Sequence, residues 1–151
     1  MRYPVVFLFL FTEACGAVSP EYGIGYAGGG PRAGTELDTA WRLGVTYAGG
    51  DPKALSTKTY VSVTISDAPI EFPGLAGKAH GTDYNEPGAA FVQVQQIGPS
   101  LLDADTPLVH EFAHVARYLM TGDPDYGHTL WFWHVVDEDF SAEGESKCAT
   151  R

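Results

Sequence analysis

The sequence predicts an α+β domain in which a short sheet packs on two helices. Two segments, residues 59–66 and 89–97, alternate apolar and polar side chains, as half-buried strands do. Residues 107–122 repeat apolar side chains at helical spacing. After a polar loop, the apolar segment TLWFWHVV at residues 129–136 indicates a second helix that packs on the first.

The two strand segments differ in their polar faces. Residues 59–66 (TYVSVTIS) place valine and isoleucine on one face and hydroxylated side chains on the other. Residues 89–97 (AAFVQVQQI) have a glutamine-rich face, which predicts a strand near a sheet edge or beside a cleft. The glycine- and proline-rich stretch between them predicts turns and one short strand around residues 77–80.

Terminal residues define the helix predicted over residues 107–122. Thr106 is expected to cap it, Pro107 suits its first position, and Gly122 suits its end. Its expected buried stripe consists of Leu108, Phe112, Val115 and Leu119. Residues 35–44 combine a polar cap, apolar side chains and a closing glycine, and therefore predict an earlier, shorter helix.

Length and charge exclude several classes of protein. With 151 residues, the chain is long enough for one domain with a hydrophobic core and too short for two. It has 19 acidic and 9 basic residues, a net charge of −10, and no cluster of lysine and arginine. We therefore expect no nucleic-acid or anionic-membrane partner.

The first residues resemble an export signal. Arg2 precedes an apolar run at residues 5–11 that is too short to span a bilayer. Small residues surround Cys15, in an arrangement similar to that of the lipid-modified cysteine of bacterial lipoproteins. Residues 1–15 therefore predict an exported protein, which is periplasmic, anchored to a membrane through a lipid on Cys15, or secreted. The alternative is that residues 5–11 form a buried strand of the domain. In an exported protein Cys15 could instead pair with Cys148 in a disulfide.

The expected start of the folded domain is residue 35. Residues 16–34 contain a glycine-rich run (YGIGYAGGGPRAG) that has little apolar surface to bury. They predict a linker, and residues 35–151 then form the domain.

The sequence HEFAH, at residues 110–114, predicts a metal site. On a helix, His110 and His114 lie one turn apart on one face, where both imidazoles can bind the same zinc ion. Glu111 would lie beside the metal and take a proton from its bound water. A catalytic zinc has three protein ligands and one open position, and His128, after the polar loop, is the expected third ligand.

HEFAH, the loop, His128 and the aromatic pair after it resemble the SprT-like family of compact zincin metalloproteases. The resemblance implies a small zincin-like domain whose short mixed sheet packs on the HExxH helix and the following helix, with an edge strand that holds an extended peptide. It also implies His110, His114 and His128 as zinc ligands and Glu111 as general acid/base. Thr129 stands where many members have glycine, and the basic or cysteine-rich extensions of the DNA-associated members are absent, so no DNA-repair role is carried over.

Two other residues are alternative third ligands. The segment TGDPDYG at residues 121–127 is similar to the aspzincin motif, which implies Asp123 as third ligand and Tyr126 as a group that stabilises the tetrahedral intermediate. Met120 replaces the first glycine of that motif. Glu138 is a more distant candidate of the gluzincin kind. If His128 is the ligand, Asp125 is expected to accept its remaining N–H.

These observations together predict an exported zinc metallopeptidase that hydrolyses peptide bonds, with Tyr126 or a nearby histidine binding the developing oxyanion. The alternative function is a non-catalytic zinc domain that uses the same ligands for stability or for binding a partner. An open fourth position on the zinc would distinguish the enzyme from the alternative.

Overall fold

The computed structural model describes residues 16–133 except 72–77, 80 and 104–105. The predicted export signal, both cysteines, Glu138 and residues 134–136 of the predicted second helix lie outside the described residues. Among the described residues of that segment, 129–131 are not helical and only Phe132 and Trp133 are. Within the described part, no helix combines the length and the apolar character needed to cross a membrane.

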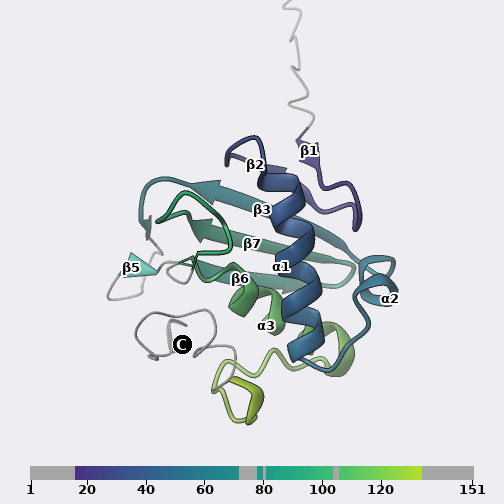
Figure 1. Cartoon of the computed structure of the whole chain (residues 1–151). Coiled ribbons are helices and arrows are strands. Elements are labelled where there is room, and N and C mark those ends of the chain that lie inside the picture. Colours follow the sequence, from purple (N-terminus) through teal and green to yellow (C-terminus); the bar gives the residue numbers. More distant parts are fainter. Residues whose placement is uncertain (1–15, 72–77, 80, 104–105, 134–151) are drawn as a thin grey trace, which may run out of the picture.

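The predicted α+β fold is confirmed, with a five-stranded mixed sheet (Figure 1). The strands, in their order across the sheet, are β1 (Ala17–Val18), β2 (Gly25–Ala27), β3 (Tyr60–Ser66), β7 (Ala89–Gln95) and β6 (Gly81–Glu86). The central strands β2, β3 and β7 are parallel, whereas β1 and β6 run antiparallel at the two edges. A separate two-stranded sheet pairs β4 (Ile70–Glu71) with β5 (Lys78–Ala79), where the sequence predicted one short strand.

Two helices cover one face of the large sheet and enclose the hydrophobic core (Figure 1). These two helices are α1 (Ala33–Tyr47) and α3 (Leu108–Thr121). The third helix, α2 (Pro52–Ser56), is short. The core-facing side chains of β3 are the alternating Val61, Val63 and Ile65 that the sequence predicted. Trp41 of α1 meets Phe112 of α3 edge-to-face, with ring centroids 5.3 Å apart.

Gly44 does not end the first helix, as the sequence predicted, because α1 continues to Tyr47. It lies instead where α1 crosses α3: a Cβ at this position would come within 2.6 Å of the Val109 carbonyl oxygen. Glycine is therefore needed for close approach of the two helices, and its role is set by packing. Both ends of the helix differ from the prediction, since α1 also begins two residues before position 35.

The predicted linker over residues 16–34 is corrected by the structure, because this segment contains β1 and β2 and belongs to the domain. The β2 strand pairs with β3, and Ile24 is only 1% exposed in the core. The buried Asp38 carboxylate accepts hydrogen bonds from the Glu21 and Tyr22 amides at 2.8 and 3.1 Å. Long-range backbone pairing and one buried carboxylate thus fix a glycine-rich segment that has few apolar side chains of its own.

The glutamine-bearing strand β7 lies near the sheet edge, as predicted, and the edge strand itself is β6, in the stretch predicted to form turns. The predicted cap of α3 is wrong. Thr106 does not cap α3; Pro107 occupies the cap position, and the Thr106 hydroxyl accepts a hydrogen bond from Ile97 N at 3.4 Å. Gly122 does end α3, in the left-handed conformation with φ of 77°, as predicted.

Candidate metal centre

His110 and His114 lie one turn apart on α3, and both are buried. Their Nε2 atoms are 3.2 Å apart. The sequence predicted that these residues would lie off the buried stripe of the helix, yet residues 108–116 are buried on all sides. The first half of α3 is therefore enclosed by the sheet, by α1 and by the chain that follows the helix.

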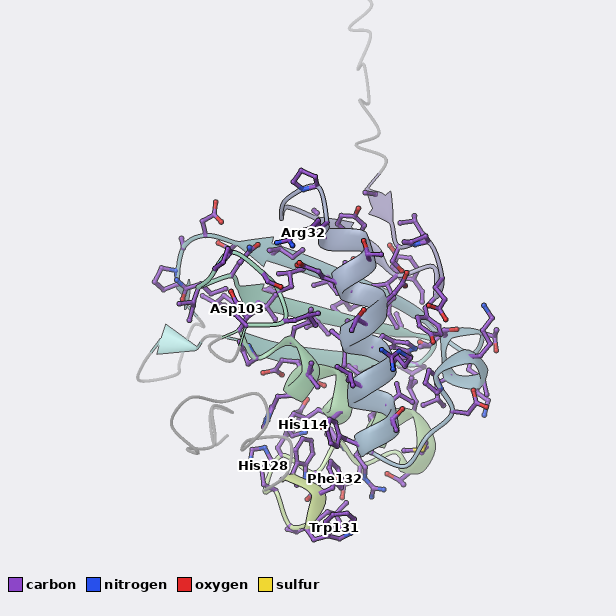
Figure 2. All side chains as sticks on the ribbon, in the orientation of Figure 1. Arg32, Asp103, His114, His128, Trp131 and Phe132 are labelled. Carbon is purple, nitrogen blue, oxygen red and sulfur yellow. The ribbon has the colours of Figure 1, made fainter. Side chains whose placement is uncertain are left out.

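His128 completes the cluster from the loop after α3. Its Nε2 atom is 3.1 Å from Nε2 of His114, and the three ligand atoms all lie within 4.8 Å of one another. Figure 2 shows His128 beside His114, although the two residues come from different segments. The described residues therefore bring together the three histidines that the sequence predicted.

The arrangement of nitrogens fits a divalent metal ion. At zinc–nitrogen distances of about 2.0–2.1 Å, tetrahedral geometry places two ligand nitrogens about 3.3 Å apart, and the two Nε2 separations are 3.1 and 3.2 Å. Nδ1 of His114 is 2.7 Å from the Pro124 carbonyl oxygen, which can only accept, so Nδ1 carries the proton and Nε2 keeps its lone pair. These three residues could therefore hold a metal ion.

Burial keeps His114 in the neutral form that a metal ligand requires. Desolvation, followed by the nearby His110, lowers the pKa of His114 to about 3, against the opposing hydrogen bond to Pro124. A metal ion would therefore meet an imidazole that is already deprotonated at neutral pH.

The loop that carries His128 has an unusual backbone. Asp125 and His128 adopt positive φ angles of 57° and 50°, and His128 N donates to the Asp125 carbonyl at 2.9 Å. The Asp125 carboxylate accepts four hydrogen bonds: from Thr129 N (3.1 Å), Thr129 Oγ1 (2.7 Å), Leu130 N (3.2 Å) and Trp133 Nε1 (2.7 Å). Desolvation raises the pKa of Asp125, but the hydrogen bonds from Thr129, Trp133 and Leu130 outweigh it, so the net shift is downward.

Trp133 packs against the whole cluster. Its ring centroid lies 5.0, 4.2 and 4.7 Å from those of His110, His114 and His128. The neighbouring Trp131 is 76% exposed at the periphery (Figure 2), so the two tryptophans have opposite roles. The sequence does not separate the two, because an aromatic run does not show which ring faces inward.

Glu111 directly follows His110 on α3, and its side chain lies against the edge strand β6. Its side chain is 1% exposed, and its Oε1 atom has no hydrogen-bond partner among the described residues. A Cβ at Gly81 of β6 would come within 2.9 Å of that oxygen, so glycine makes room for the carboxyl group. Desolvation, followed by the charge of Asp83, raises the pKa of Glu111 well above its ordinary value.

Sequence reasoning missed Asp83, which brings a second carboxyl group close to Glu111. Asp83 is 1% exposed and accepts a hydrogen bond from Asn85 Nδ2 at 2.5 Å. Its backbone carbonyl accepts from the Tyr126 hydroxyl at 3.5 Å. The signal in the sequence is the alternation of Gly81, Asp83 and Asn85 on one side of a strand, but without apolar residues the strand itself was not recognised.

The alternative ligands are placed differently. Asp123 is exposed, and its Oδ1 atom accepts from Asp125 N at 2.8 Å within the same turn, apart from the histidine cluster. The Tyr126 ring packs against that of His114 at a tilt of 53°, with ring centroids 5.2 Å apart, and its hydroxyl faces β6. Glu138 lies outside the described residues.

Comparison with known proteins found no matching family model, curated protein or solved structure. The SprT-like and aspzincin resemblances therefore rest on their motifs alone.

Proposed function

We propose that this protein is a zinc-dependent metallopeptidase. The observation that carries the proposal is the convergence of three imidazole Nε2 atoms. The residue that follows the first of these histidines is a buried glutamate, Glu111, whose Oε1 has no hydrogen-bond partner in the described part of the chain. Zinc bound there would polarise a peptide carbonyl and lower the pKa of a bound water. Glu111 would accept the proton of that water and transfer it to the leaving amine.

The number of ligands supports catalysis over a closed structural site. Among the described residues, the cluster holds three histidines and no fourth histidine, cysteine or carboxylate. Structural zinc sites have four protein ligands, whereas catalytic sites keep one position for water or substrate. Three ligands thus favour an enzyme.

The position of β6 supports a peptide as the substrate. In the described structure β6 pairs with β7 on one side and forms the edge of the sheet on the other. Gly81 of this strand lies against Glu111, and the Asp83 carbonyl lies against Tyr126. An extended peptide that added to this edge would pass both candidate catalytic side chains. Tyr126 is then the candidate donor to the oxyanion.

Burial favours a second candidate, a zinc site that only stabilises the domain. His114 is fully buried and His110 nearly so, and Trp133 covers the three rings. In that case the protein would bind zinc tightly, hydrolyse nothing, and unfold more readily without the metal.

One experiment separates the two candidates. Metal content and hydrolysis of a mixed peptide library would be measured for the wild type with and without a chelator, and for Glu111→Gln. Zinc-dependent hydrolysis that Glu111→Gln abolishes while retaining zinc supports the peptidase. Stoichiometric zinc with no hydrolysis of any peptide would leave only the structural role.

The third ligand is tested in the same assay. His128→Ala is expected to lose most of the bound zinc, and Asp123→Ala to retain it, because only His128 faces the other two histidines. The opposite pattern would replace this ligand set with the aspzincin one. Circular dichroism of both variants controls for loss of fold.

A further inference from the structure

We infer that Asp125 is the positioning residue of the metal centre: through the turn and through Trp133, it holds His128 in place before a metal ion binds. This inference rests on the metal-binding part of the proposed function and is independent of peptide hydrolysis. The three histidines are held in place by different kinds of backbone. His110 and His114 are held by a hydrogen-bonded helix, whereas His128 lies on a loop with a left-handed backbone.

A left-handed backbone at a residue other than glycine is unfavourable by itself, so other contacts must hold it. The Asp125 carboxylate supplies them, since Oδ1 binds the amide and hydroxyl of Thr129 and Oδ2 binds the amide of Leu130. The Asp125 carbonyl binds the amide of His128 itself. One residue therefore fixes the chain on both sides of the third ligand.

The Asp125 carboxylate also orients the indole ring of Trp133, which packs against the three histidines. Oδ2 accepts from Trp133 Nε1 at 2.7 Å, in a buried hydrogen bond. That bond sets the indole where its ring lies within 5.0 Å of all three imidazole centroids. Rotation of Trp133 would remove the ring that packs against His128, so Asp125 restrains His128 by two routes.

Asn at position 125 would keep the size of the side chain but weaken this network. An amide has one acceptor oxygen in place of two, and it has no charge to strengthen the hydrogen bonds that remain. We expect Asp125→Asn to weaken zinc binding by roughly 10- to 100-fold, the range typical of residues that orient metal ligands.

A double-mutant cycle distinguishes positioning of His128 from a general structural role. Zinc dissociation constants would be measured by competition with a chromogenic chelator for the wild type, Asp125→Asn, His128→Ala and the double variant. If Asp125 acts through His128, Asp125→Asn weakens binding in the wild type and changes it by less than about twofold in the His128→Ala background. An equal loss in both backgrounds, or no loss in the wild type, overturns the inference.

Asp38→Asn is the matched control, because Asp38 is also a buried carboxylate that accepts backbone amides, but between α1 and the β1–β2 segment. It should lower thermal stability and leave the zinc dissociation constant unchanged. Trp133→Phe and Thr129→Val each remove one hydrogen-bond donor to Asp125. They replace Asp125→Asn in the zinc-binding measurement if that variant does not fold. Each should weaken zinc binding less than Asp125→Asn, and unchanged affinity in both would contradict the inference.

The result is separable from the test of hydrolysis. If the wild type binds zinc and cleaves no peptide, the peptidase proposal is wrong and the proposed role of Asp125 is unaffected. A wild type that cleaves peptides while Asp125→Asn binds zinc as tightly as the wild type removes only the role of Asp125.

Discussion

The two segments that build the metal centre are stabilised by different forces. The helix α3 is held by apolar burial, with Phe112, Val115 and Ala116 fully enclosed around its two histidines. The loop that follows it is held by hydrogen bonds to Asp125 and by the packing of Trp133. A helix can present ligands at a spacing dictated by its own geometry, whereas the loop needs a polar network to fix a single residue.

The largest expected effect tests the proposed peptidase activity and concerns the helical segment. Glu111→Gln should reduce the rate of peptide hydrolysis by about 10²- to 10⁴-fold, because glutamine cannot accept the proton of the bound water. Zinc content should not change, since both ligands on α3 stay in place. Steady-state kinetics and metal analysis measure the two quantities, and Glu21→Gln at an exposed site is the matched control. Unchanged turnover would show that the helix contributes ligands and no base.

The next effect tests whether apolar burial alone stabilises α3. Phe112→Ala should lower the free energy of unfolding by about 3–5 kcal/mol, because it leaves a cavity against Trp41. The loss should be the same with and without zinc, measured by urea denaturation. Phe91→Ala is the matched control, because Phe91 is 40% exposed, and it should cost about 1 kcal/mol or less. A zinc-dependent cost at Phe112 would mean that the core and the metal centre are not separate.

Removal of zinc should have its main effect on the loop. With free zinc at 100 times its dissociation constant, chelation should lower the free energy of unfolding by about 2.7 kcal/mol. Hydrogen exchange should then increase in the loop after Gly122 more than in α3. The metal would hold the loop through His128, whereas α3 is held by its own backbone hydrogen bonds. Equal loss of protection in both segments would show that the metal also holds the helix.

The smallest effect concerns the junction of the two segments. Gly122→Ala should cost about 1 kcal/mol, because Gly122 has φ of 77° and alanine disfavours that conformation. Gly30→Ala is the matched control: Gly30 has no positive φ, and no atom within 4 Å would contact its Cβ. Thermal denaturation would measure both. A neutral Gly122→Ala would indicate that the helix end can shift without strain.

The sequence by itself determined the elements that depend on local periodicity. The strand at residues 59–66, the helix that carries HEFAH and the end of that helix at Gly122 were predicted, because each depends on side chains within a few turns of one another. The same spacing placed His110 and His114 on one face. These features need no knowledge of the rest of the chain.

The tertiary structure decided the features that depend on residues far apart in sequence. The glycine-rich segment became part of the sheet because β3 supplies its hydrogen-bond partners, and the polar strand β6 was recognisable only beside β7. Asp83 reached Glu111, and Asp125 reached Trp133, through chain folding that no local pattern records. Helical spacing is a property of one segment. The third histidine, its support and the neighbouring carboxyl group require several segments to meet, and only the packed structure shows where they do.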